Sequence, residues 1–406
     1  MATIAVLGTL DSKGDEHAFV ADQIRLRGHE ALLIDVGTGS DPGVRPEVSR
    51  FEVAEAGGVD LQPILDRRDR GECVAAMTRA APILLERLVE NGTIEGVISL
   101  GGGGGTAIAT AAMRVLPVGF PKVMVSTLAS GNTAHYVGTR DIVMIPSIVD
   151  VSGLNSVSRT IFTRAAGAIS GMVDSKVDIS DARPIIVASM FGNTTDLVSM
   201  AREQLEAAGY EVLVFHATGT GGRTMEALVE SGMVAGVLDV TTTEWADQLV
   251  GGVLAAGPDR LDAMTRARVP AVIAPGCLDM VNFGERDTLP EEFEGRAIYQ
   301  HNPQVTLVRT SADECDQLGR ILARKANANG SSTAILIPTR AISVISAPGG
   351  VFHDADADAR LFNAIREEAE VEVQELEVEI NSEEFANACV GKLLELIEEG
   401  GSDSSD

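Results

Sequence analysis

The sequence predicts an α/β protein made of two duplicated Rossmann-like domains, each a parallel sheet flanked by helices. Short apolar runs without polar alternation indicate strands buried on both faces, and helical patterns separate them. In addition, three blocks of the first half recur in the same order in the second half. The pairs are Arg25–Asp41 with Glu206–Arg223, Leu88–Gly105 with Leu228–Glu244, and Phe120–Ser126 with Val269–Pro275.

Composition supports a two-domain globular chain. The 406 residues exceed one ordinary core, and 45% are hydrophobic with only 4% aromatic. No apolar run is long enough to span a membrane and no basic-then-apolar leader opens the chain, so a cytoplasmic location without membrane association is expected. The four cysteines are scattered, which predicts free thiols and no metal site.

The net charge of −27 is the most unusual bulk property. Only five lysines occur, so arginine supplies nearly all the positive charge. A self-repelling acidic surface is tolerated in a salt-rich cytoplasm, which favours a halophilic protein. Nucleic acid is not an expected partner, because no basic stripe could neutralise phosphates.

The strands expected in the first copy are short, and helical patterns such as Glu16–Arg27 and Cys73–Glu90 lie between them. Gly28 and Gly92 fit helix ends. A long helix over Asn155–Val173 should complete a first domain of residues 1–176. The expected strands are Thr3–Leu7, Ala31–Val36, Val97–Leu100, Val123–Ser126 and Ile142–Ile145.

The second copy repeats this order over residues 184–398, after a polar linker at Asp174–Arg183. A strand at Val371–Ile380 and an amphipathic helix at Ser382–Glu398 should follow, on either domain. Residues 399–406 are expected to form a disordered acidic tail. The other expected strands are Ile185–Met190, Val212–Phe215, Val237–Val240, Ala271–Ala274, Val305–Val308 and Thr333–Pro338.

Open parallel sheets bind ligands at the carboxyl ends of their strands, so the loops there are the candidate site. After the third strand, five successive glycines can present N–H groups to an anion with no Cβ in the way. After the first strand, Lys13 is a cation at a helix N-terminus in a chain poor in lysine. The alternatives are a solvated lysine and a flexible glycine linker. The residues predicted to bind a nucleotide are Gly8, Thr9, Asp11, Ser12, Lys13, Gly37, Thr38, Gly101, Gly102, Gly103, Gly104, Gly105, Thr106, Ser126, Thr127, Ser130, Gly131 and Asn132.

The second copy replaces the five glycines by Thr241–Thr243 and Glu244, so it should carry a different site. His301 is expected in a polar loop, Tyr299–Pro303, before a strand. Cys277 and His301 could form a thiolate pair, although a buried free thiol is the commoner case. The acidic string Asp354–Asp358 fits a cation site or an acid-rich helix N-terminus, and the second is favoured. The candidate residues of this second site are Gly221, Gly222, Arg223, Glu244, Cys277, Asn282 and His301.

Several motifs together resemble the tomato mosaic virus resistance protein ATP-binding domain family, over nearly the whole chain to about Phe362. They are GTLDSKGDE, GGGGGT, VSTLASGN, IPSIVDVSGLNSVSR, FHATGTGGRTME, PGCLDMVNFG and the late HNP and FHDADAD strings. The resemblance implies two Rossmann-like subdomains, ATP binding by the first, and self-association as a dimer or tetramer. The family's Asp-Thr-Lys appears here as Asp11-Ser12-Lys13. The plant member's carboxyl-terminal barrel is absent, so inhibition of a virus is not implied.

Two functions of different kind are compatible with these residues. The first is an ATP-binding enzyme, with or without Mg²⁺, that acts on a small anionic metabolite between the domains. The second is a nucleotide-dependent regulatory subunit without turnover, since no pairing of base and nucleophile can be recognised. A nicotinamide-dependent dehydrogenase fits less well, because the dinucleotide fingerprint is missing.

Overall fold

The computed structural model describes residues 1–175 and 183–402, and the chain divides into two compact units, residues 1–178 and 179–406. The expected linker falls mainly on residues outside the described ranges. No helix in the described ranges has the length and apolar character needed to cross a bilayer.

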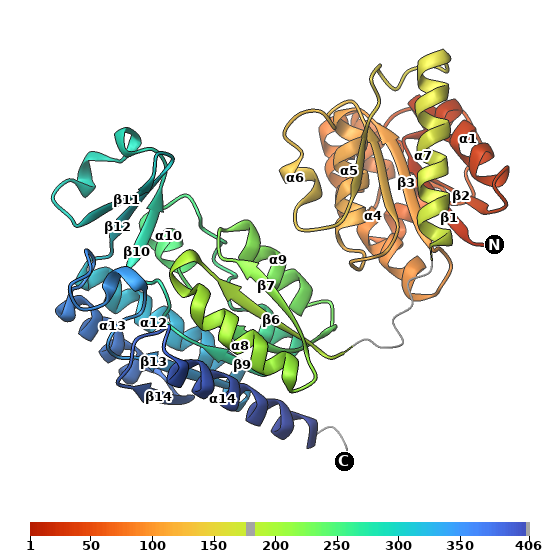
Figure 1. The fold of residues 1–406 in the computed structure, drawn as a ribbon. Coiled ribbons are helices and arrows are strands. Elements are labelled where there is room, and N and C mark those ends of the chain that lie inside the picture. The colour runs from red at the N-terminus through yellow and green to blue at the C-terminus, as the bar shows by residue number, and fades with distance from the viewer. Residues whose placement is uncertain (176–182, 403–406) are drawn as a thin grey trace. The chain divides into compact units, whose positions relative to one another are not determined.

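The first unit is a five-stranded parallel sheet between two layers of helices (Figure 1). On one face, α1 and α7 cover Ile4 and Val6, and on the other α4 and α5 cover Ala5 and Leu7. Its elements are β1 Thr3–Gly8, α1 Leu10–Arg25, β2 Glu30–Asp35, α2 Arg50–Ala56, α3 Gln62–Arg67, α4 Arg70–Glu90, β3 Gly96–Gly101, α5 Gly103–Arg114, β4 Lys122–Ser126, α6 Ala134–Val137, β5 Val143–Pro146 and α7 Ser156–Asp174.

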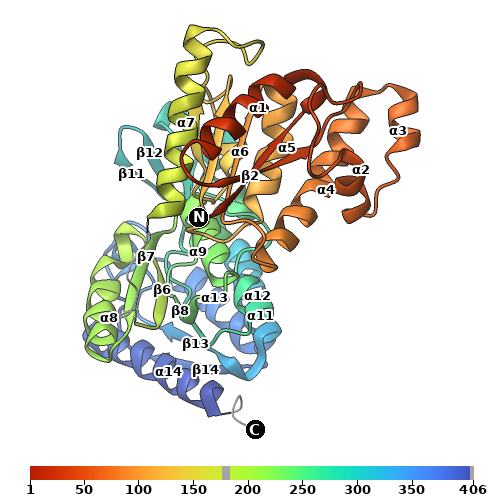
Figure 2. The same cartoon turned by 90° about the vertical axis from the view of Figure 1, so that its right-hand side faces the viewer.

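The second unit repeats this architecture with additions (Figure 2). One face of its six-stranded parallel sheet is covered by α8 and α14, the other by α9 and α11 to α13. Its elements are β6 Ile185–Met190, α8 Thr195–Ala207, β7 Glu211–His216, α9 Thr220–Val229, β8 Val234–Asp239, α10 Glu244–Val250, α11 Ala263–Ala267, β9 Ala271–Ile273, β10 Met280–Phe283, β11 Ile298–Asn302, β12 Val305–Arg309, α12 Ala312–Asn329, β13 Thr333–Pro338, α13 Ala355–Glu368, β14 Glu372–Leu376 and α14 Glu383–Ser402.

The strand orders confirm the predicted duplication. The first sheet is ordered β2-β1-β3-β4-β5, and the second runs β7-β6-β8-β9-β13 with β14 added at its edge. Both units therefore place their first and third strands side by side, as in the doubly wound folds that bind ligands between those two strands.

Three expectations about the second unit need correction. The segment Val305–Val308 is a strand, but it belongs to a separate antiparallel sheet of order β10-β12-β11. His301 lies in β11 of that sheet rather than in a loop. Helix α14 continues to Ser402, beyond the expected end at Glu398, so residues 399–402 of the expected tail are helical and its residues 403–406 lie outside the described ranges.

The carboxyl-terminal elements pack on the second unit, which settles the alternative left open by the sequence. Strand β14 pairs with β13 in parallel, and α14 packs against α8 and the sheet. Helix α14 contributes to the core of the second unit, since its residues Phe385, Cys389 and Leu393 are fully buried.

Candidate functional site

A cavity of about 870 Å³ opens at the carboxyl ends of the strands in the first unit. We call it the first cavity. Its walls come from the start of α1, the segment after β2, the link between α3 and α4, and the start of α5. Helices α1 and α5 follow β1 and β3, the neighbouring strands where the order of the sheet reverses. The lining residues are Thr9, Asp11, Ser12, Lys13, Thr38, Gly39, Ser40, Leu65, Arg68, Arg70, Val74, Gly102, Gly103, Gly104, Gly105, Ile108 and Asp150.

The glycine run is a helix N-terminus rather than the loop that the sequence suggested. Gly102 is the N-cap residue of α5, and Gly103, Gly104 and Gly105 form its first turn. The Thr106 N–H donates to the Gly102 carbonyl at 2.8 Å, so helical bonding begins there. The three glycine N–H groups before it have no acceptor within the helix, and these glycines line the cavity. A helix N-terminus in this position favours a bound anion.

The glycines are required for close approach rather than for a left-handed backbone. None of the five has a positive φ. A Cβ on Gly101 would lie 3.1 Å from the Gly105 backbone, whereas a Cβ on Gly103 would meet no atom within 4 Å. Gly103 thus leaves open the space that a ligand would use.

The stretch after β1 also starts its helix earlier than expected. Helix α1 begins at Leu10, whose N–H donates to Asp35 Oδ1 at 3.1 Å, instead of at Glu16. Thr9 occupies the N-cap position without a side-chain cap bond, and the backbone is non-helical at Lys13 (φ −137°). The Lys13 ammonium donates to the Val151 carbonyl, so the predicted cation is anchored at the cavity wall.

Two carboxylates organise the segment after β2. Asp11 Oδ2 accepts from the N–H groups of Thr38 at 3.2 Å and Gly39 at 2.7 Å, and Asp35 Oδ1 accepts from Gly37 N at 2.8 Å. Burial raises the pKa of Asp35. Asp11 Oδ1 is buried without a hydrogen-bond partner in the described chain. Asp11 therefore shapes the cavity wall and keeps one oxygen free.

The sequence patterns did not single out Arg68 and Arg70, two exposed cations that line the first cavity. Both flank Asp69, the N-cap of α4, and Arg68 ends α3 with a left-handed backbone (φ 55°). Neither makes an ion pair in the described chain. With Lys13 they give three cations against the carboxylates of Asp11 and Asp150. The run DRRDR was visible, but the sequence did not show which arginine faces the sheet edge.

The charge of the chain is unevenly divided. Residues 1–178 contain 21 acidic and 16 basic residues, and residues 179–406 contain 38 and 16. The net charges are −5 and −22, so the unit with the first cavity is close to balanced.

Several predicted site residues lie outside the first cavity. Gly8 makes room for the buried His17 ring, because a Cβ there would fall 2.0 Å from Nε2. The Thr106 and Ser126 hydroxyls bond each other at 2.7 Å in the core. Asn132 Oδ1 accepts from Ala134 N at 3.1 Å. Gly37, Gly101 and Gly131 are also absent from the lining, whereas Ser126, Thr127 and Ser130 line a neighbouring cavity.

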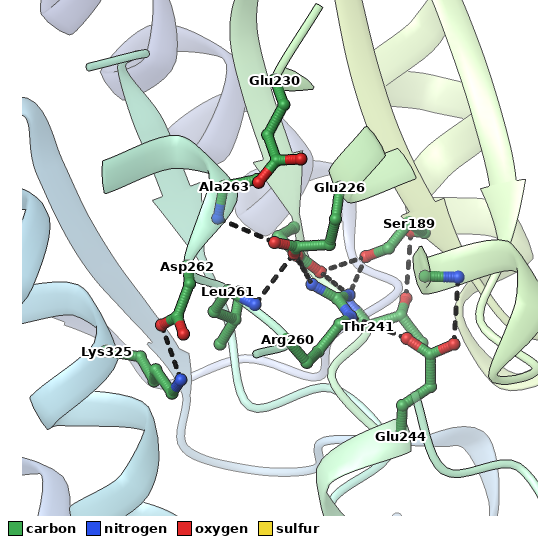
Figure 3. Close-up of polar contacts among 12 residues, drawn as sticks. Ser189, Glu226, Glu230, Thr241, Glu244, Arg260, Leu261, Asp262, Ala263 and Lys325 are labelled. Atoms are coloured by element: carbon green, nitrogen blue, oxygen red, sulfur yellow. Dashed lines mark hydrogen bonds and ion pairs between the residues drawn. The ribbon is translucent and has the colours of Figure 1, made fainter. Parts of the chain in front are cut away.

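In the second unit, Glu244 is part of a buried charge cluster (Figure 3). Arg260, 2% exposed, donates Nε to Glu244 Oε2 at 2.7 Å and Nη2 to Asp239 Oδ1 at 2.8 Å. It also pairs with Glu226 at 3.0 Å. These three carboxylates raise the pKa of Arg260 against the effect of burial. The Glu244 carboxylate is thus paired with the buried Arg260 guanidinium.

The same carboxylate closes a helix N-terminus. Glu244 Oε1 accepts from the N–H groups of Gly219 at 2.6 Å and Gly222 at 3.1 Å, at the start of α9. A Cβ on Gly222 would lie 2.0 Å from Glu244 Oε2. In the second copy the N-terminus of α9 is therefore occupied by the protein's own carboxylate, whereas in the first copy the N-terminus of α5 is open to the cavity.

The remaining second-site candidates do not meet. Arg223 donates to the Ala255 carbonyl at 3.0 Å on the surface, and Gly221 packs against the His216 carbonyl. Cys277 is fully buried, and burial places its thiol pKa well above the ordinary value. Asn282 binds the buried Asp247 at 2.7 Å, and His301 is exposed in β11. No thiolate pair exists among these described residues, and no group of three metal-ligating side chains occurs in the described chain.

The acidic string at Asp354–Asp358 is a helix N-terminus, as favoured from the sequence. Asp354 caps α13 by accepting from Ala357 N at 3.0 Å. Asp358 binds Arg309 at 2.5 Å, and burial raises its pKa to about 6.

Comparison with known proteins gives matches over both units. Residues 2–178 and 183–397 match the N-terminal and C-terminal domains of Uncharacterised protein family (UPF0261). A UPF0261 protein of Clostridium tetani is 48% identical over 97% of this chain and 99% of its own length. The ToMV resistance protein Tm-1(GCR237) of Solanum lycopersicum is 38% identical over 96% of this chain and 55% of its own length.

The comparison with solved structures includes distant matches. A UDP-GlcNAc 2-epimerase from Neisseria meningitidis bound to UDP-GlcNAc matches 67% of this chain and 82% of its own. Its identity is 9% and its TM-score is 0.25, so it carries no argument about a ligand.

Proposed function

Since the chain belongs to the uncharacterised protein family UPF0261, whose N-terminal domain here contains the first cavity, we propose that this cavity binds the phosphates of ATP or a related nucleotide. The observation that carries the proposal is the open N-terminus of α5. Gly103, Gly104 and Gly105, whose first-turn N–H groups have no acceptor within the helix, line a cavity that Lys13, Arg68 and Arg70 also line.

Polarity and size support the proposal. A nucleotide triphosphate needs donors and cations for its phosphates and an apolar surface for its base. The lining offers both, since Leu65, Val74 and Ile108 lie among the polar residues. A volume of about 870 Å³ falls within the usual range of small-molecule sites, roughly 300–1,000 Å³.

The residues present also fit an accompanying Mg²⁺. Asp11 is a carboxylate of the lining, and its Oδ1 has no hydrogen-bond partner in the described chain. Carboxylate oxygens together with phosphates are the usual Mg²⁺ ligands. The ion would neutralise phosphate charge beside Asp11.

The test is calorimetric titration of ATP into the parent protein and Gly103→Val. A Cβ at Gly103 would meet no other heavy atom within 4 Å and the backbone there has no positive φ, whereas the branched side chain of valine would enter the proposed phosphate space. Binding should fall by at least about tenfold, equivalent to 1.4 kcal/mol. Gly171→Val, at an equally open position in α7, is the matched control and should bind as the parent does. Equal affinity of Gly103→Val and Gly171→Val would contradict the site.

One further measurement on the same protein distinguishes the two kinds of function. ADP release with Mg²⁺ present separates an ATP-consuming enzyme from a nucleotide-dependent regulatory subunit.

A further inference from the structure

A second cavity of about 570 Å³ lies beside the first, in the same unit. Its walls come from the segments after β4 and β5, and Asp150 lines both cavities. The two are close along the sheet edge as well, because a Cβ on Gly102 would lie 3.7 Å from Thr127 Oγ1. The second cavity is lined by Ser126, Thr127, Ser130, Pro146, Ser147, Ile148, Val149 and Asp150.

The lining of the second cavity differs in chemistry from that of the first. It contains four hydroxyl groups and one carboxylate, with no lysine, arginine or histidine. Ser126 and Ser147 are buried and bonded internally, Ser126 to Thr106 and Ser147 to the Val149 carbonyl. Thr127 and Ser130 are exposed. The side chains available to a ligand are therefore two hydroxyls and the Asp150 carboxylate.

The backbone that presents Asp150 is strained. The Val149 N–H donates to the Ser147 carbonyl at 2.7 Å around Ile148, whose φ is 65°. A three-residue turn with positive φ is rare and costly, particularly for a β-branched residue. Ile148 is 73% exposed, so packing of its side chain does not explain the turn. Strain of this kind concentrates at ligand sites.

The first turns of α1 hold the strained segment in place. Lys13 donates to the Val151 carbonyl, and Glu16 accepts from the Gly153 N–H. The residue that lines the first cavity as a cation thus also fixes the chain next to Asp150.

We propose that the second cavity is a subsite for an uncharged, hydroxyl-bearing small molecule, bound beside the nucleotide phosphates with Asp150 accepting a hydrogen bond from it. The inference rests on the proposed function for its second half, the neighbouring nucleotide. An anionic ligand is disfavoured, because Asp150 would repel it and no cation of the lining would attract it. This differs from the anionic metabolite that the sequence suggested.

The experiment uses chemical protection of a single introduced thiol. All four native cysteines are buried, so Ser130→Cys supplies one accessible thiol at the cavity wall. The full-length variant is alkylated in the presence of ATP with increasing glycerol or glycerate, which share a carbon skeleton and differ in charge. Glycerol should slow alkylation in a saturable manner, and glycerate should protect several-fold less. Thr93→Cys, exposed in the turn before β3, is the control and should show no saturable protection by either.

A second variant tests the role of the carboxylate. In the Ser130→Cys background, Asp150→Asn should raise protection by glycerate relative to glycerol, because the repulsion is removed while a hydrogen-bonding group is kept. Absence of saturable protection by glycerol, or equal protection by both ligands before Asp150 is changed, overturns the subsite. Calorimetry with ATP is run in parallel. If ATP does not bind, the proposed function is overturned. If ATP binds but glycerol does not protect the thiol, only the second subsite is overturned.

Discussion

At the scale of single residues, Lys13 has two roles that can be separated. Lys13 lines the first cavity, and its ammonium donates to the Val151 carbonyl. Lys13→Ala should weaken binding of ATP by about 1.5–3 kcal/mol, the range for a hydrogen bond to a charged group. It should also lower the free energy of unfolding by about 0.5–1.5 kcal/mol through the lost Val151 bond. Calorimetry and denaturant unfolding at one fixed ionic strength measure both.

Arg67→Ala is the control for this change. Arg67 is exposed and paired with Glu72 near the cavity, yet it is absent from the lining. Its loss should leave ATP affinity unchanged. If Lys13→Ala binds ATP as tightly as Arg67→Ala does, Lys13 acts only as an anchor for the segment after β5.

A buried acid in the second unit predicts a pH dependence of stability. Burial raises the pKa of Asp247 from the ordinary 3.8 to about 7. Between these values the folded protein retains the proton and the unfolded chain has released it. The stabilisation is therefore complete below about pH 3.8 and is lost as the pH rises through 7.

Asp247→Asn should remove this dependence. Relative to the parent, the variant should gain about 2–3 kcal/mol of unfolding free energy between roughly pH 5 and pH 7, at about 1.4 kcal/mol per unit. Urea unfolding at several pH values measures it. Asp287→Asn, an exposed acid of the same unit, should track the parent. Parallel curves for Asp247→Asn and the parent would contradict the raised pKa.

At the scale of elements, Glu244 is the feature that closes the start of α9. Its removal leaves Arg260 short of one buried partner and leaves the Gly219 and Gly222 N–H groups without an acceptor. Breaking a buried pair in this way costs about 3–5 kcal/mol, so Glu244→Ala should be severely destabilised in thermal and urea unfolding.

The exposed pair of Glu230 and Arg266 provides the comparison. Their atoms are 2.6 Å apart, but both side chains are more than a third exposed. Glu230→Ala should therefore cost less than about 1 kcal/mol. Similar losses for Glu230→Ala and Glu244→Ala would show that the buried cluster has no special weight.

Element types and most strands were predictable, because parallel strands buried on both faces give plain apolar runs and helices such as α4 and α7 carry strong patterns and caps. The helix starts at Leu10 and Gly103 were not predictable. Their first turns consist of polar or glycine residues that read as loops, and the bond from Leu10 N to Asp35 joins distant segments. The antiparallel sheet escaped notice because only β12 has an apolar run.

The candidate site was predictable where it depends on strand order and not where it depends on side-chain direction. Lys13 and Gly102–Gly105 were found from their place after β1 and β3. Thr106 looked equally suitable, but helical geometry turns its hydroxyl towards Ser126. In the second copy, the pairing of Glu244 with Arg260 could not be seen, since 16 positions separate them and Arg260 belongs to no repeated block.

At the scale of the whole molecule, the uneven charge predicts different salt responses for the two units. Residues 183–402 belong to the unit with net charge −22, and residues 1–175 to the unit with −5. Raising salt from 0.01 M to 1 M shortens the Debye length from about 30 Å to about 3 Å and screens this repulsion. The melting temperature of the isolated second unit should therefore rise with NaCl much more than that of the first.

The same two pieces test whether the units are independent. Residues 1–175 contain a complete sheet and should fold and bind ATP alone. Circular dichroism across NaCl concentrations and calorimetry measure the two outcomes. Equal salt responses would argue against the halophilic interpretation, and a folded first piece without ATP affinity would contradict the site.

The strand order also determines how long a strand waits for its neighbour during translation. Strand β1 is translated first, yet one of its edges stays unpaired until β3, because 87 residues lie between Gly8 and Gly96. At about 5–20 residues per second the ribosome needs roughly 5–20 s to make them. In the second unit only 43 residues separate β6 from β8. The first unit therefore exposes an apolar strand edge for about twice as long during translation, and we expect its folding yield to depend more strongly on chaperones that cover nascent chains.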